Sequence, residues 1–189
     1  RMIFACNILG NPNDLKELKN ISDKNNLILI EDNCESMGAK FDQKYAGTYG
    51  LMGSFSSFYS HHICTMEGGC ILTDDEEIYH ILLCLRAHGW TRDLPKKNKI
   101  TGTKSDNFFE ESFKFILPGY NVRPLELSGA IGRIQLKKLK RFVEMRVENS
   151  KLFKDLFNDH PIFMIQKEIG FSSWFGFSLV IREGVEIDR

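Results

Sequence analysis

The sequence lacks an excess of charge of either sign. Its 25 Lys and Arg residues balance 25 Asp and Glu residues, so it has no basic field to attract nucleic acid. It also lacks an apolar run of the ~20 residues that a membrane span needs, and no leader with a charged and then an apolar segment opens the chain. We therefore expect neither a nucleic-acid partner nor a membrane partner.

Cysteine pairs at metal-binding spacing are missing as well. The five cysteines are odd in number, widely spread and include no C-x-x-C pair, which argues against a disulfide framework and a zinc ribbon. They fit a reducing compartment, and the expected location is the cytoplasm. Disorder is not expected, because 42% apolar residues with 12% aromatics can bury a core.

Strand and helix patterns alternate in the first half of the chain and predict an α/β fold. Residues 3–8 and 27–30 are compact apolar runs, and helical spacing begins between them at Leu15, which predicts a βαβ unit with parallel strands. Acidic Glu31 and Asp32 follow the second strand at once, where ligands of open α/β sheets usually bind. Further elements expected are strands over 55–59 and 69–73 and a helix over 76–87.

The second half is expected to leave this domain. Residues 91–114 are polar and lysine-rich and are interpreted as a mobile loop. Pro124 is expected in the first turn of a long amphipathic helix that reaches about Asn158. Strands over 163–165 and 174–181 would then start a second domain. The chain opens and stops beside apolar runs, and we interpret both ends as cut.

A set of motifs along the chain resembles one enzyme family, the DegT/DnrJ/EryC1/StrS sugar aminotransferases. The motifs stand in the family's order and spacing and cover nearly the whole chain. They are Glu31-Asp32-Asn33-Cys34-Glu35-Ser36, Gly53-Ser54-Phe55-Ser56, His61-His62-Ile63-Cys64-Thr65-Met66-Glu67-Gly68-Gly69, Arg86-Ala87-His88-Gly89-Trp90, Gly119-Tyr120-Asn121-Val122-Arg123, Gln135-Leu136 and Ser173-Trp174-Phe175-Gly176.

The resemblance implies an aspartate aminotransferase-like fold, the fold type I of pyridoxal-phosphate enzymes. Residues 1–123 would be the later part of the large mixed-sheet domain that binds the cofactor. Residues 124–189 would be the long linking helix and the start of the small C-terminal domain. The family's earlier segment supplies a loop for the cofactor phosphate and an aromatic ring over the pyridine. The resemblance therefore implies that this chain alone forms an incomplete, inactive site.

Three residues match the family's cofactor-binding positions. Asp32 matches the aspartate that pairs with the pyridine nitrogen, where a carboxylate keeps the ring protonated and able to accept electrons. Glu35 matches a position near the ring hydroxyl, and Ser56 matches the serine that binds the phosphate. Without the resemblance, Asp32 would be read as a helix cap or turn residue, Glu35 as a solvated loop charge and Ser56 as an unremarkable strand serine.

No lysine occurs between Lys44 and Lys96, and this absence bears most on function. In the family's aminotransferases, the lysine that holds the cofactor lies five residues after the phosphate-binding serine and six before the acidic residue of the acidic-Gly-Gly motif. Both counts end on His61. An imidazole exchanges protons near neutral pH but cannot form the stable covalent link of a lysine amine.

Members with this histidine are sugar 3-dehydratases, so the resemblance implies a lyase in which His61 is the acid and base. Pyridoxal 5'-phosphate or pyridoxamine 5'-phosphate would be held without a covalent bond, with L-glutamate as amino donor. The alternatives are a nucleotide-sugar aminotransferase and an inactive relative in which His61 is structural. A metal site is disfavoured, because His61 and His62, as neighbours on an extended segment, would point to opposite faces. His62 is expected behind His61.

His88, Arg92 and Asn121 match positions that, in histidine-bearing members, reach the active site from the other subunit of a homodimer. Asn121 would bind the cofactor phosphate, and His88 and Arg92 would lie near the substrate or cofactor. Without the resemblance, His88 would be read as part of a helix end and Asn121 as a turn residue.

Cysteine positions separate two kinds of histidine-bearing enzyme. One kind, acting on a CDP-linked sugar, holds a [2Fe-2S] cluster through a C-x57-C-x-C-x7-C pattern. Counting from Cys34 leads to Arg92, Leu94 and Gly102, and no cysteine follows Cys84. No cluster is expected, which favours the other kind. Its substrate is a nucleotide-linked 4-keto-6-deoxy sugar such as GDP-4-keto-6-deoxymannose, for deoxysugars of the lipopolysaccharide O-antigen.

Overall fold

The computed structural model describes residues 1–185, and the chain divides into two compact units. Unit 1 comprises residues 1–72 and 127–189, and unit 2 comprises residues 73–126. These units do not follow the expected boundary between 123 and 124, and the division of the whole fold into a large and a small domain stays a prediction.

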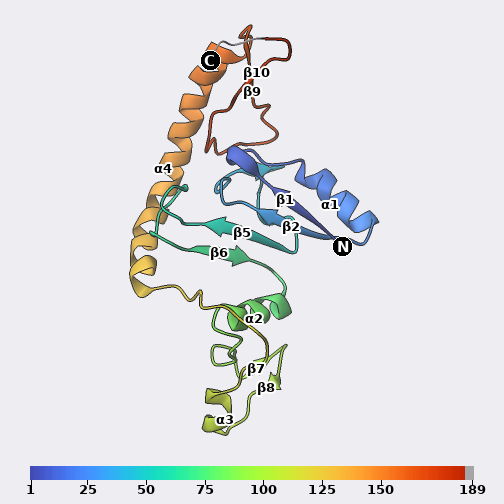
Figure 1. Ribbon diagram of the computed structural model, residues 1–189, viewed down its shortest axis with the longest axis vertical. Coiled ribbons are helices and arrows are strands. Elements are labelled where there is room, and N and C mark those ends of the chain that lie inside the picture. The colour runs from blue at the N-terminus through green and yellow to red at the C-terminus, as the bar shows by residue number, and fades with distance from the viewer. Residues whose placement is uncertain (186–189) are drawn as a thin grey trace. The chain divides into compact units, whose positions relative to one another are not determined.

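Unit 1 is built on a four-stranded mixed sheet in the order β1-β2-β5-β6 (Figure 1). The strands are β1 (Met2–Cys6), β2 (Ile28–Asp32), β5 (Met52–Ser56) and β6 (Gly69–Leu72). β1 pairs parallel with β2 and β2 parallel with β5, whereas β6 is antiparallel to β5. The expected βαβ unit and mixed sheet are thus present, and the ends of β2 and β5 meet at one edge.

Helix α1 (Leu15–Lys24) closes the βαβ unit between β1 and β2. Asp14 begins the helix, because its side chain accepts a hydrogen bond from the backbone N–H of Glu17 at 2.9 Å. Leu15 is fully buried and packs with Ala39 and Ala46 into a small apolar cluster. A 3-10 turn, η1 (Ile8–Gly10), lies between β1 and this helix.

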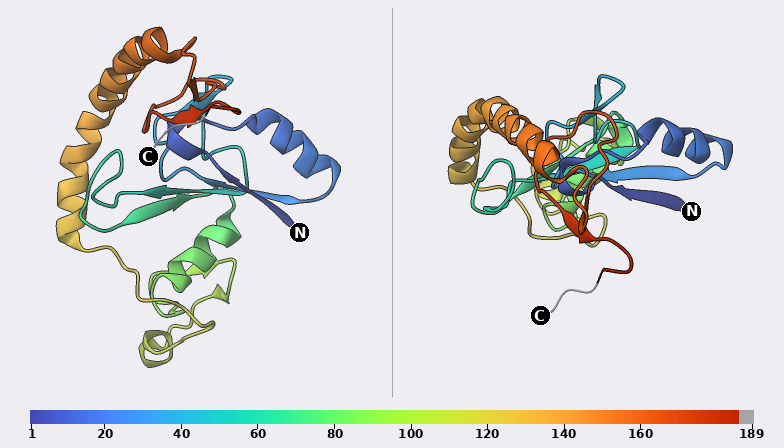
Figure 2. Two further views of the ribbon diagram at one scale, coloured as in Figure 1. Left: turned by 45° about the horizontal axis from the view of Figure 1, so that its top comes forward. Right: turned by 90° about the horizontal axis from the view of Figure 1, so that it is seen from above.

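Helix α4 (Glu126–Phe157) passes the loops that follow β2 and β5, and it lies across unit 1 from α1 in both views of Figure 2. An added Cβ at Gly38 or Gly132 would meet Val143 or Thr65 at 3.1 Å, which shows how closely the helix approaches these loops. After the helix, β9 (Phe163–Ile165) and β10 (Leu179–Ile181) form an antiparallel pair.

Several boundaries differ from expectation. The third sheet strand ends at Ser56 and not at residue 59, because the chain turns there and the Ser56 hydroxyl accepts the backbone N–H of Phe58 at 3.1 Å. The expected strand over 174–181 is only Leu179–Ile181, since Trp174 has a positive φ of 49°. Helix α4 starts two residues after Pro124. A short hairpin that was not expected joins β3 (Lys40–Phe41) to β4 (Lys44–Tyr45).

Unit 2 contains α2 (Glu76–Leu85), β7 (Lys97–Asn98), β8 (Gly102–Thr103) and α3 (Phe108–Ser112). Residues 91–114, interpreted from the sequence as a mobile loop, contain β7, β8 and α3, and hydrogen bonds internal to the segment support these short elements; the mobility of the loop stays a prediction. Asn98 accepts the backbone N–H of Thr101 at 2.7 Å, and Asn107 caps α3 by accepting that of Phe109 at 3.1 Å. No helix within residues 1–185 is long and apolar enough to cross a membrane.

Candidate functional site

Two parallel strands end side by side and carry the centre of the candidate site. Asp32 closes β2 and pairs in register with Ser54 of β5, and Ser56 closes β5 two residues later. His61 lies in the turn that follows, with its backbone N–H on the Phe58 carbonyl at 3.0 Å. The structure thus gathers Asp32, Ser56 and His61 at one edge of the sheet in unit 1.

The Asp32 carboxylate is held in its ionised form. Its Oδ1 accepts the backbone N–H of Cys34 at 3.0 Å and the hydroxyl of Ser54 at 3.3 Å. Burial works to raise the pKa, but the thiol and N–H of Cys34, the Ser54 hydroxyl and the charge of His61 outweigh it, so the pKa of Asp32 lies below its usual value. Asp32 is half-buried, and its unused lone pairs can accept another donor.

The neighbouring thiols are poor nucleophiles. Burial and the hydrogen bond and charge of Asp32 raise the pKa of Cys34 to about 11. Burial, Asp32 and Glu35 likewise raise the pKa of Cys6. Both therefore stay protonated near neutral pH.

Glu31, next to Asp32, points into the protein and has a structural role. Its fully buried carboxylate accepts the backbone N–H groups of Gly47, Tyr49 and Gly50 at 2.6, 2.6 and 2.9 Å. These charge-assisted bonds hold the turn that leads into β5. The strand alternation that buries Glu31 therefore turns Asp32 the other way, toward the site.

Ser56 and His61 contact each other directly. The Ser56 Oγ and the His61 Nδ1 are 3.3 Å apart. No described residue of the chain makes a hydrogen bond to the other ring nitrogen of His61, Nε2. The half-buried imidazole thus has one nitrogen fixed by the chain and one available to a reacting group.

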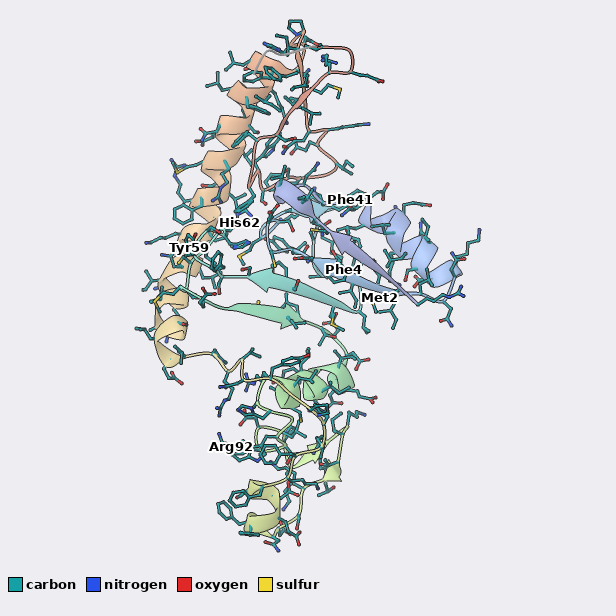
Figure 3. All side chains as sticks on the ribbon, viewed as in Figure 1. Met2, Phe4, Phe41, Tyr59, His62 and Arg92 are labelled. Carbon is teal, nitrogen blue, oxygen red and sulfur yellow. The ribbon has the colours of Figure 1, made fainter. Side chains whose placement is uncertain are left out.

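His62 differs sharply from its neighbour, although the two are adjacent in sequence. It is 2% exposed, its Nε2 donates to the Glu35 carbonyl at 2.8 Å, and its Nδ1 accepts from the Arg146 guanidinium at 2.9 Å. Figure 3 shows His62 beside α4, which carries Arg146. Burial, assisted by the charges of Arg146 and His61, lowers the pKa of His62 to about 4. It is neutral near pH 7, and its expected place behind His61 stays a prediction.

Glu35 faces the backbone of η1. Its carboxylate accepts the N–H of Leu9 at 2.7 Å, while its carbonyl binds His62. Leu9 has a positive φ of 54°, so this hydrogen bond supports an uncommon backbone conformation. The expected contact of Glu35 with a cofactor ring hydroxyl stays a prediction.

The remaining predicted residues, His88, Arg92 and Asn121, lie in unit 2 and are exposed. Ala87 and Asn121 are paired through an antiparallel bridge, and the His88 N–H binds the Tyr120 carbonyl at 2.8 Å, so His88 and Asn121 lie on adjacent segments. The Arg92 guanidinium lies 4.1 Å from the Trp90 ring centroid (Figure 3 labels Arg92). All three residues belong to unit 2, which brings His88 and Asn121 together, and their roles stay predictions.

Two residues of the site were given no role from the sequence, although Phe175 belongs to one of the quoted motifs. Phe175 lies in the loop between β9 and β10, and its ring stacks on His61 at a centroid distance of 5.7 Å and an angle of 15°. Arg146, which binds His62, lies on the same helix face as the buried residues Val143 and Ser150. A cationic residue on the buried face of a helix indicates a specific partner, so the sequence did contain a signal for Arg146. Among residues 1–185, no cluster of three His, Cys, Asp or Glu side chains could hold a metal ion.

Comparisons with known proteins agree with this geometry. Two curated GDP-4-keto-6-deoxy-D-mannose 3-dehydratases match all of this chain: that of Escherichia coli O55:H7 at 67% identity and that of Yersinia pseudotuberculosis at 64%. The match covers 49% and 48% of their lengths, so the chain spans about half the length of the curated relatives it matches.

Solved structures of the same enzyme superimpose closely. The E. coli dehydratase with bound hydrated PLP has a TM-score of 0.96 at 66% identity over 99% of this chain and 48% of its own. A form with a trapped PLP-glutamate geminal diamine has a TM-score of 0.96 at 65% identity, over 99% of this chain and 48% of its own. A double variant with adjacent serine and histidine replaced by asparagine and lysine has a TM-score of 0.96 at 64% identity, over 100% of this chain and 50% of its own.

The predicted fold class is confirmed by these superpositions, which place the chain within the fold of the pyridoxal-phosphate-dependent aminotransferases. The family model described as the DegT/DnrJ/EryC1/StrS aminotransferase family matches residues 1–189. The chain belongs to the DegT/DnrJ/EryC1/StrS aminotransferase family.

Proposed function

We propose that the full-length protein is a pyridoxal-phosphate-dependent 3-dehydratase that acts on GDP-4-keto-6-deoxymannose or a close relative. The observation that carries this proposal is the half-buried His61, which contacts the Ser56 hydroxyl where the family's aminotransferases have lysine. The identity of 67% and 64% to two enzymes named GDP-4-keto-6-deoxy-D-mannose 3-dehydratase supports the same reaction and nucleotide.

The double variant of the solved dehydratase supports the choice of His61 as the histidine that replaces the family's lysine. That variant changes a serine and the histidine that directly follows it. This chain contains one serine directly followed by a histidine, and it is the pair Ser60-His61. The substituted histidine there and His61 here are therefore proposed to be equivalent.

The residues present fit a pyridoxal phosphate cofactor. The Asp32 carboxylate, ionised and with acceptor capacity left, suits a protonated pyridine nitrogen, and the Ser56 hydroxyl suits a phosphate oxygen. When bound, the cofactor supplies an electron sink that stabilises negative charge on carbon. The solved dehydratase with bound hydrated PLP supports the same cofactor for this protein.

His61 would move the proton. With Nδ1 beside Ser56, the imidazole would present Nε2 to the reacting carbon, take a proton from it and give that proton to the C3 hydroxyl of the sugar, which would leave as water. His62 cannot share this task near neutral pH, because its two nitrogens are engaged by Glu35 and Arg146. The two adjacent histidines thus divide into one that exchanges protons and one that supports it.

The remaining partners are part of the proposal. A PLP-glutamate adduct in a solved relative supports L-glutamate as the amino donor. The exposed positions of His88, Arg92 and Asn121 suit residues that reach a second subunit, so we propose a homodimer. We propose that the protein acts in the cytoplasm, in a pathway that makes deoxysugars for the O-antigen.

The first test uses the full-length protein with pyridoxal phosphate, L-glutamate and GDP-4-keto-6-deoxymannose. We expect a 3-deoxy product, and borohydride followed by mass spectrometry should show no covalent cofactor adduct. His61→Asn should lower turnover at least about a hundredfold, because acid and base catalysis contributes on that order. Its circular dichroism spectrum should match that of the unsubstituted protein.

His61→Lys provides the matched positive control, because an amine at this position should give the adduct that the native protein lacks. A lysine adduct in the native protein, or an accumulating 4-amino sugar, would favour the aminotransferase instead. Binding of no cofactor at all would favour an inactive relative.

A further inference from the structure

Phe175 is the side chain from the β9–β10 loop that contacts His61. Its ring stacks on the His61 imidazole at 5.7 Å, and it contacts the His62 ring at a centroid distance of 5.0 Å and an angle of 45°. The Arg146 guanidinium lies 6.0 Å from the Phe175 ring centroid, at the outer range of cation-π attraction. Phe175 therefore meets both histidines and the cation that binds one of them.

The loop that carries Phe175 is fixed on the backbone of η1. The N–H of Ser173 and the hydroxyl of Ser172 both donate to the Gly10 carbonyl, at 2.8 and 3.0 Å. Trp174 beside it is 1% exposed, and its indole N–H donates to Glu168 at 3.3 Å. The ring of Phe175 is thus presented from a rigid loop.

His62 and Arg146 hold the other side of this arrangement. Because Arg146 donates to Nδ1 and Nε2 donates to Glu35, His62 is locked as one neutral tautomer in one orientation. A ring that cannot turn gives Phe175 a fixed surface to pack against. The His61 imidazole, by contrast, makes one hydrogen bond to the described residues, the 3.3 Å contact with Ser56, and otherwise only ring contacts: an edge contact with Phe58 at 5.9 Å and the stack on Phe175.

We propose that Phe175, held by His62 and Arg146, is a positioning residue for His61, which rests on the proposed function of His61 as acid and base. The stack restricts rotation of the imidazole, so that Nδ1 stays on Ser56 and Nε2 stays toward the reacting carbon. Phe175 also covers one side of the imidazole against water. Phe175 makes no bond to the reacting groups itself.

Phe175→Leu in the full-length protein tests this proposal, because it removes the ring and keeps an apolar side chain. We expect kcat to fall by about tenfold to a hundredfold, since small misplacements of reacting groups cost on that order. KM and the affinity for pyridoxal phosphate should change less than about threefold. Phe175→Tyr keeps the ring and should restore most of kcat.

Phe177→Leu is the matched control from the same loop. Its ring packs on Trp174 at 5.4 Å and on Phe153 at 5.1 Å. It should lower stability and leave kcat and its pH profile unchanged. Equal losses of kcat in both leucine variants, or native kcat in Phe175→Leu, would overturn the proposal.

A second readout does not depend on dehydratase activity. Nitrogen-15 NMR of histidine-labelled, cofactor-free protein reports which ring nitrogen of each histidine carries hydrogen, and His61→Asn identifies the His61 signals. Phe175→Leu should shift the two His61 nitrogens toward a mixture of tautomers, and Phe177→Leu should not. If the native protein proves not to be a dehydratase, this comparison still decides the role of Phe175, and unchanged His61 signals would refute it.

Discussion

At the scale of single residues, burial sets the protonation of His62. His62 is buried against a guanidinium, and its pKa of about 4 lies below the usual 6.5. His62 therefore binds a proton below about pH 6.5 in the unfolded chain, but only below about pH 4 in the folded protein. Stability due to this group is fully present near neutral pH and is lost as the pH falls through that window.

His62→Gln should remove this pH dependence, because the amide can accept from Arg146 and donate to Glu35 without titrating. Between about pH 7 and pH 4.5, the native full-length protein should lose about 2 kcal/mol more of its free energy of unfolding than the variant. Urea unfolding at both pH values measures the difference. Asp32, whose pKa is lowered, loses its contribution only below its unfolded pKa of 3.8, so it falls outside this range. Parallel losses in the two proteins would contradict the assignment.

At the scale of elements, the approach of the β9–β10 loop to η1 depends on Gly10. Gly10 has a φ of +83°, and an added Cβ would lie 2.6 Å from the Phe175 nitrogen and 2.7 Å from the Trp174 nitrogen. These contacts are with backbone atoms, which cannot move aside as the end of a side chain can. A side chain at residue 10 would therefore displace the loop that carries Phe175.

Gly10→Ala should lower both stability and turnover of the full-length protein, with a loss of more than about 2 kcal/mol in the free energy of unfolding. Gly184→Ala is the matched control, because Gly184 has nearly the same φ, +81°, and open space around its added Cβ. It should lose about 1 kcal/mol from backbone strain alone. Thermal unfolding and kcat of both variants separate the strain of a positive φ from the steric clash. Equal effects would mean that the loop is not held as described.

The elements show what the sequence could and could not predict. Apolar runs predicted β1 and β2, because strands of parallel sheets are typically apolar on both faces. In this chain β1 nevertheless buries only Ala5 and leaves Met2 and Phe4 exposed. Acidic residues at the end of β2 predicted the site edge. Residue type does not distinguish a buried carboxylate from an exposed one, so the roles of Glu31 and Asp32 emerge only from the pairing. Phe175 reaches His61 across more than a hundred residues, and no local pattern predicts such a contact.

At the scale of the whole molecule, the proposed site combines residues from unit 1 with residues of unit 2 from a second copy. His61 and Asp32 belong to unit 1, and Arg92 belongs to unit 2 with its guanidinium exposed. If Arg92 serves the site of the other subunit, a dimer of two different variants has two unlike sites, because each site takes His61 from one subunit and Arg92 from the other. That asymmetry can be measured without a structure of the dimer.

Mixing full-length His61→Asn with full-length Arg92→Ala should restore activity, provided that each variant alone is inactive. After unfolding and refolding together in equal amounts, about half of the dimers are mixed, and each has one site with both His61 and Arg92 intact, so about a quarter of native activity should return. His61→Asn mixed with Asp32→Asn should restore nothing, because Asp32 and His61 come from the same unit 1. If the mixture with Arg92→Ala also shows no activity, Arg92 acts within its own subunit, and the main functional support for a homodimer is removed.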